Sequence, residues 1–153
     1  MRPAPDRPIA LSPADRLDIL ELLARADAAA TRRDATSYVD LFTDDAVLDG
    51  SQGLHQGKAA ITASVGPIWA AEGPVSAHLT LNVVLAPSHD ANEVVITSTL
   101  LIVAPPAMAG EHGVVLGIAS ITQWVVRTEA GWRIIRRTVA SLDREQTEAN
   151  DHV

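Results

Sequence analysis

The sequence predicts an α+β domain in which helices come first and the strands of a mostly antiparallel sheet follow. In the first part of the chain, up to about residue 70, apolar residues recur with helical spacing. Residues 76–142 instead contain long stretches rich in Val, Ile and Thr, separated by loops with Pro, Asn or Gly. The loops are too short for helical crossovers, which favours antiparallel strands with the helices gathered on one face of the sheet.

The composition predicts one folded domain and narrows the classes of partner. A chain of 153 residues with 47% hydrophobic and 20% charged residues is long enough to bury one core. Its formal net charge of −7 repels a phosphate backbone, so nucleic acid is not an expected partner. The apolar runs are too short to cross a membrane, and the N-terminus lacks the apolar stretch of a secretory signal. We therefore expect a cytoplasmic protein.

The first helix is predicted to begin after Ser12 and to run to about Thr31. Ser12 is a good N-cap, Pro13 suits the first helical position, and Asp15 is an acid in the first turn. Helical spacing places one stripe of side chains on the face expected to pack inward. That stripe consists of Leu17, Leu20, Leu23, Ala24, Asp27 and Ala30.

The next segments are shorter. Residues 34–42 are predicted to form a second helix, and Val47 to Asp49 a short strand. Residues 51–57 have a glycine near each end and are predicted to be a loop. A third helix covers residues 58–70, with Pro67 expected to end or kink it.

Four long strands are predicted in the second half, and no repeat or second domain is visible. The strands cover residues 76–86, 93–104, 113–128 and 131–142. We expect residues 12–143 to form the domain, between a flexible arm of residues 1–11 and a flexible tail of residues 144–153.

Four motifs occur in the order seen in SnoaL-like domains of the nuclear-transport-factor-2-like superfamily. They are LFTDDAVLDG after a pair of helices, QGKAAI, HLTLN and VVRTEAGWRIIRR. The chain resembles this family over roughly residues 14–143. The resemblance implies a curved sheet that forms a cone-shaped pocket with the helices, and a homodimer. The family includes polyketide cyclases, ketosteroid isomerases and dehydratases, so the fold does not settle the function.

His78 is the main catalytic candidate. Strand alternation places His78, Thr80 and Asn82 on one face of the predicted strand. The dehydratases that this segment resembles carry a catalytic histidine here, and an imidazole is suited to moving a proton near pH 7. Asn82 would donate to a substrate oxygen. The alternatives are a histidine bonded inside the sheet or exposed on it, and an amide satisfied by backbone.

Two further positions resemble the ketosteroid isomerases. Asp49 lies close to the position of their general base, although a slip of one residue would turn it to the opposite face, and it also suits a cap of the turn before Gly50. Gln123 aligns with the acid that forms part of their oxyanion hole. Its amide could polarise a carbonyl but could not exchange a proton.

The sequence also departs from the family pattern. Ala26 stands where the isomerases and bile-acid dehydratases carry a helix tyrosine, and Thr31 where the dehydratases usually carry an aspartate. Asp27 is the expected substitute partner of His78, because a carboxylate would orient the ring and raise its basicity. The alternative is that Asp27 pairs with an arginine of its own helix or is solvated.

The remaining candidates are binding residues. Arg137 matches the arginine of the family's last strand and could neutralise a carboxylate or enolate. Tyr38 and Trp69 are candidates for the pocket wall, with core packing or a dimer face as the alternative. His55 and His112 fall in predicted loops without acids at metal spacing, so we expect both to be exposed and expect no metal site.

These observations lead to one expected function and one alternative. We expect a cofactor-independent proton-transfer enzyme, namely a dehydratase, isomerase or cyclase. Its substrate would be a hydrophobic, cyclic, oxygen-bearing molecule such as a polyketide or steroid-like metabolite. The alternative is a non-catalytic domain that binds a small molecule or associates with another subunit, because the family's tyrosine and dyad aspartate are absent.

Overall fold

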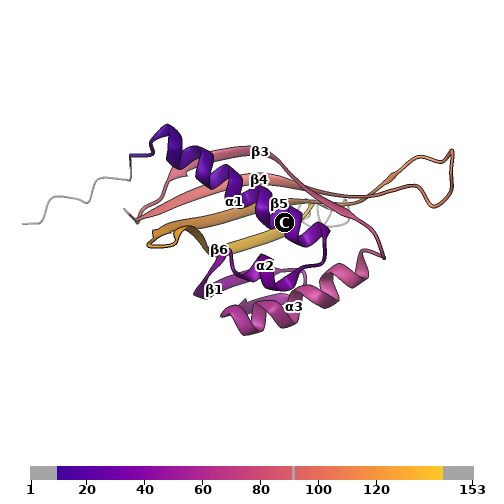
Figure 1. Ribbon diagram of the computed structural model, residues 1–153, viewed down its shortest axis with the longest axis horizontal. Helices are drawn as coiled ribbons and strands as arrows, with labels where there is room; N and C mark the ends of the chain where they lie inside the picture. The colour runs from indigo at the N-terminus through magenta and orange to yellow at the C-terminus, as the bar shows by residue number, and fades with distance from the viewer. Residues whose placement is uncertain (1–9, 91, 143–153) are drawn as a thin grey trace, which may run out of the picture.

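The computed structural model describes residues 10–90 and 92–142 and shows three helices and one curved sheet (Figure 1). The predicted tail, and the predicted arm up to residue 9, lie outside the described residues; Leu11 packs against the core. The helices are α1 (Pro13–Thr31), α2 (Ala35–Val39) and α3 (Lys58–Ala71). The strands are β1 (Phe42–Gly50), β2 (Gly53–Gln56), β3 (Ala77–Pro87), β4 (Glu93–Ala104), β5 (Val114–Thr128) and β6 (Gly131–Ser141).

The six strands form one sheet in the order β2-β1-β6-β5-β4-β3. Only β1 and β6 are parallel neighbours, and the other four pairs are antiparallel, which confirms the predicted sheet. Figure 1 shows α1 lying across one face of the sheet, where it packs against β3, and α3 beside β1. The two edge strands, β2 and β3, are thus brought toward the helices at opposite margins of the sheet.

The start of α1 is confirmed, but its predicted inward face is only partly right, since Leu23 and Ala30 are buried and the first two leucines of the stripe are not. The backbone N–H of Asp15 donates to Ser12 Oγ at 3.1 Å, and the Ser12 N–H donates back to the Asp15 carboxylate at 3.0 Å. Leu17 and Leu20 are 67% and 41% exposed. The buried face is turned by about one residue from the predicted stripe, and the helical spacing of Ile19, Leu22 and Ala26 fits it equally well. The buried residues are Ile19, Leu22, Leu23, Ala26, Ala29 and Ala30.

Three predicted boundaries in the first half need correction. The second helix ends at Val39, and Phe42 already belongs to β1, where it pairs with Ile134 of β6. The predicted loop contains β2, which pairs with β1. The third helix continues through Pro67 to Ala71. Each error has the same cause, because tertiary packing and pairing override a weak local preference in short segments.

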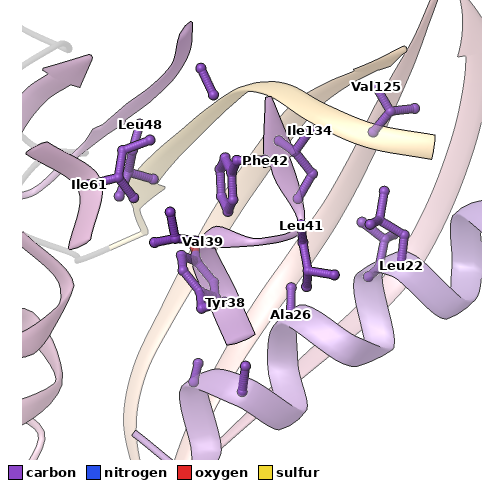
Figure 2. Packing of buried hydrophobic residues seen from close by; sticks show 14 of the residues in the cluster. Leu22, Ala26, Tyr38, Val39, Leu41, Phe42, Leu48, Ile61, Val125 and Ile134 are labelled. Atoms are coloured by element: carbon purple, nitrogen blue, oxygen red, sulfur yellow. The ribbon is translucent and has the colours of Figure 1, made fainter. Parts of the chain in front are cut away.

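The core lies between the helices and the concave face of the sheet. Figure 2 shows Tyr38 and Phe42 packed together between α1 and the strands, with their ring centres 5.1 Å apart. Ile19, Phe42 and Ile134 are at most 1% exposed. Among the described residues, no helix is both long and apolar enough to span a membrane. This core holds the sheet and the three helices in fixed positions around one hollow.

Candidate functional site

A cavity of about 740 Å³ lies on the concave face of the sheet. Its walls come from the end of α1, from α2 and α3, and from parts of all six strands. Most of the lining is aliphatic, and the volume falls in the usual range for a small-molecule site. The lining side chains that can carry charge or exchange a proton are Tyr38, His55, Glu72, His78 and Arg137.

His78 lies on the cavity wall, in contact with a carboxylate. The residue is 8% exposed, and its Nε2 lies 2.8 Å from Oε2 and 3.0 Å from Oε1 of Glu72. Its backbone N–H donates to Thr31 Oγ1 at 3.0 Å, which ties the start of β3 to the end of α1. Glu72 follows α3 directly and was not expected from the sequence.

A small network holds Glu72 in place. Ser76 Oγ donates to its Oε2 at 2.8 Å, and Arg33 Nη1 donates to the same oxygen at 3.1 Å. Burial raises the pKa of Glu72, but the hydrogen bond and charge of His78, with Ser76 and Arg33, outweigh burial and leave that pKa below its ordinary value. An ionised carboxylate only accepts hydrogen bonds, so Nε2 of His78 is the donor in this pair, and Nδ1 is the ring nitrogen that Glu72 does not engage.

Arg33 is positioned to organise this network. Its backbone has a φ of 59°, a left-handed conformation that turns the chain between α1 and α2. Besides Glu72, its guanidinium donates to Ser76 Oγ at 2.9 Å and to the carbonyl oxygen of Gly73 at 3.2 Å. The end of α1 and the turn after α3 are therefore joined through one side chain.

Asp27 does not contact His78, so the predicted Asp27–His78 pair is wrong. Its carboxylate accepts from the backbone N–H of Thr80 at 2.7 Å and from Thr80 Oγ1 at 2.9 Å. Asp27 thus attaches α1 to β3 two residues beyond His78. The partner of His78 comes from the end of α3, which packs there only in the folded chain.

Arg137 places a buried guanidinium on the cavity wall. The residue is 4% exposed, its guanidinium carbon lies 5.8 Å from the centre of the Tyr38 ring, and no carboxylate within residues 10–90 and 92–142 forms an ion pair with it. Burial raises the pKa of Tyr38, and the nearby charge of Arg137 opposes that shift. Trp69 also lines the cavity and meets Tyr38 edge-on at 5.4 Å.

Three other predicted site residues do not line the cavity. Asp49 points to the outer face of the sheet, because its neighbour Leu48 faces inward. On that outer face its carboxylate lies 3.8 Å from Arg136 Nη2. Asn82 is exposed and has a φ of 56°, at a β-bulge that interrupts the alternation from His78. Gln123 is fully buried beside Arg137 but behind the cavity surface.

Glu72, Arg33 and His55 were not predicted as site residues from the sequence. Glu72 had one detectable signal, because an acid at the end of a helix is unfavourable there and suggests another role. His55 was expected to be exposed, but it lies on β2 and lines the cavity. His112 is exposed, as expected. No group of three or more His, Cys, Asp or Glu side chains in the described part of the chain could hold a metal ion.

Solved structures with this architecture are similar in fold at low identity. A protein of unknown function with a cystatin-like fold from Nostoc punctiforme has a TM-score of 0.76 and 22% identity, over 89% of this chain and 96% of that one. The protein Aln2 from a Streptomyces species has a TM-score of 0.80 and 16% identity, over 93% of this chain and 100% of that one. An NTF2-like protein with a cystatin-like fold from Novosphingobium aromaticivorans has a TM-score of 0.71 and 24% identity, over 86% of this chain and 84% of that one.

The family follows from a match in sequence. No curated protein matches the chain. The family model described as the SnoaL-like domain matches residues 12–138, which is most of the chain and includes every cavity wall except the last residues of β6. The helices, the curved sheet and the enclosed hollow are those expected from the resemblance. The chain therefore belongs to the SnoaL-like domain family.

Proposed function

We propose that this protein is a cofactor-independent proton-transfer enzyme, a dehydratase, isomerase or cyclase, with His78 as its general base. The observation that carries the proposal is the buried His78–Glu72 pair on the wall of a mainly aliphatic cavity. A base fixed by a carboxylate and shielded from bulk water is a common arrangement for moving a proton at a carbon centre. The SnoaL-like family includes polyketide cyclases and isomerases, which supports this class of chemistry.

The mechanism moves one proton by way of His78. Nδ1 of His78 takes a proton from a carbon next to a substrate carbonyl, while Glu72 stabilises the positive charge that forms on the ring. The electron pair of the broken C–H bond forms the C=C bond of an enolate, and the π electron pair of the carbonyl group moves to its oxygen. The protonated His78 then returns the proton to another carbon, or to a departing oxygen, so that proton and charge balance.

The substrate class follows from the cavity. Its aliphatic lining and its aromatic wall of Tyr38 and Trp69 favour a hydrophobic, cyclic molecule. The mechanism requires at least one carbonyl oxygen on that molecule. Polyketide-like and steroid-like ketones have both properties, and they are the substrates with which to begin.

The test is turnover of such ketones by His78→Gln and Glu72→Gln, with His112→Gln as the exposed control. Loss of the general base should lower kcat by about 10²–10⁴-fold. Glu72→Gln should lower kcat less and leave KM nearly unchanged, because the ring remains but is less well oriented. Turnover by His78→Gln at the rate of the unmodified protein would remove His78 from the mechanism. Binding of these ketones without turnover by the unmodified protein would instead favour the non-catalytic binding domain.

We also propose a homodimer formed through the outer face of the sheet. Leu79, Leu81 and Val84 point away from the cavity and are between 41% and 59% exposed. Apolar side chains gathered on one sheet face are typical of an association surface. Sizing chromatography with light scattering should give twice the chain mass, and Leu81→Glu should give a monomer; a monomeric unmodified protein would contradict the proposal.

A further inference from the structure

One row of paired residues crosses four strands of the sheet on its concave face. His55 of β2 pairs with Leu48 of β1, Leu48 pairs with Arg137 of β6, and Arg137 pairs with Gln123 of β5. Residues paired directly across neighbouring strands point to the same side of a sheet. Leu48, His55 and Arg137 all line the cavity, and Gln123 lies directly behind it.

Several polar atoms of this row lack hydrogen-bond partners. His55 Nε2, Arg137 Nε and both amide atoms of Gln123 are closed off from solvent, and none has a partner in the described residues. Buried polar groups are normally paired. The described part of the chain therefore leaves this row, and Arg137 in particular, without polar compensation.

The charges around the cavity indicate the kind of partner. A guanidinium is always charged, and Arg137 is buried without an ion pair to the described residues. Within residues 10–90 and 92–142, the only acidic side chain on the cavity wall is Glu72, which is already engaged by Arg33, Ser76 and His78. One positive charge is therefore left uncompensated at the row of His55, Arg137 and Gln123.

We propose that His55 and Arg137 form a recognition site for a carboxylate, so that the ligand of this cavity is an apolar molecule with one carboxylate group. A carboxylate is planar, only accepts hydrogen bonds and matches the guanidinium fork with two parallel bonds. Its single charge balances that of Arg137, whereas a neutral amide does not. His55 supplies an N–H from the edge strand, and Gln123 lies beside Arg137 on the neighbouring strand.

The geometry allows this arrangement. Neighbouring strands lie about 4.8 Å apart, so the Cα atoms of His55 and Arg137 are separated by roughly 10 Å, with the smaller Leu48 between them. Two inward-pointing side chains at that spacing can meet the same carboxylate from either side. The inference rests on the proposed function only in taking this cavity as the ligand site.

The test compares adamantane-1-carboxylate with adamantane-1-carboxamide by calorimetry and thermal shift on the full chain. The two probes have the same apolar body and differ in charge. The unmodified protein should bind the carboxylate at least tenfold more tightly than the amide. Arg137→Gln should remove this preference, His55→Gln should reduce it severalfold, and Arg136→Gln and His112→Gln, which alter exposed positions, should preserve it.

Other results would overturn the site. Equal binding of the two probes by the unmodified protein, or an unchanged preference in Arg137→Gln, would exclude a carboxylate site at this row. Arg137→Lys keeps the charge but not the fork and should bind the carboxylate with intermediate affinity, which separates recognition from misfolding. Because the readout is binding, the carboxylate site can be disproved while His78 remains the general base. Conversely, the turnover results for His78→Gln do not affect the carboxylate site.

Discussion

At the scale of single residues, the pocket contains side chains that favour function at the expense of stability. Arg137 is desolvated and has no counter-ion among the described residues. A buried charge without a partner destabilises a fold, whereas an apolar side chain of similar size does not. Glu72 shows the opposite arrangement, since three side chains donate to it. The two residues should therefore respond differently to substitution.

Arg137→Met is expected to stabilise the ligand-free protein. Methionine keeps the packing against Tyr38 and removes the uncompensated charge, so about 1 kcal/mol of stability and roughly 2–4 °C in Tm should be gained. Differential scanning calorimetry measures the shift, with Arg136→Met on the outer face as the control. A fall in Tm would mean that Arg137 has a stabilising partner in the folded protein.

Glu72→Gln is expected to change the tautomer of His78. In the unmodified protein the carboxylate accepts from Nε2–H, so the neutral ring should carry its proton on Nε2. An amide can donate as well as accept, so the variant should populate both tautomers. Nitrogen NMR of labelled histidine distinguishes them. Asp27→Asn is the matched control. A tautomer change of His78 in Asp27→Asn, with no change in Glu72→Gln, would mean that Asp27 is the partner of His78.

At the scale of elements, the β-bulge in β3 determines which residues reach the cavity. The pairing of β3 with β4 shifts between Leu81 and Val84, and Asn82 takes the left-handed conformation at that point. Strict alternation would have carried Asn82 to the face of His78. The bulge instead turns it to solvent and bends the edge strand, as bulges commonly do near sites.

Substitutions at Asn82 should therefore follow backbone preference rather than side-chain chemistry. Asn82→Val should cost ~1–2 kcal/mol, because a β-branched residue is strained at positive φ. Asn82→Gly should cost less, since glycine adopts this conformation freely. Urea unfolding measures both, and Thr122→Val, at a regular position of β5, is the control. Equal stability of the valine and glycine variants would argue against the bulge.

At the scale of the whole molecule, ionised carboxylates couple the fold to pH. The pKa of Glu72 lies below its ordinary value of 4.5 despite burial, through His78, Ser76 and Arg33. Hydrogen bonds from Ser12 and Ser37 likewise lower the pKa of Asp15 and Asp34. The folded state thus favours the ionised form at both the pocket and the helix starts.

Stability should consequently fall in acid. A lowered pKa contributes stability that is present above about pH 4.5 and is lost as the pH falls through the folded-state value. Thermal unfolding between pH 3 and pH 7 should show a declining Tm below about pH 4.5, and Glu72→Gln should make the decline shallower. Glu129→Gln, at an exposed turn, should keep the original slope. Identical slopes in all three proteins would remove Glu72 from the acid response.

The sequence by itself determined the class of fold and the order of its elements apart from β2, and it supplied His78, Arg137, Tyr38 and Trp69 as candidates for the cavity wall. The fold follows from periodicity, capping and motif order, which act over short stretches of chain, and the candidates His78 and Arg137 follow from the family resemblance. Only the tertiary structure decided the partner of His78, the inward face of α1 and the site at His55. Each depends on groups distant in sequence: α3 brings Glu72 to β3, β2 carries His55 into the sheet, and a bulge turns Asn82 away from the cavity. Local patterns cannot specify such contacts, because a one-residue shift in register reverses which side chains face the cavity.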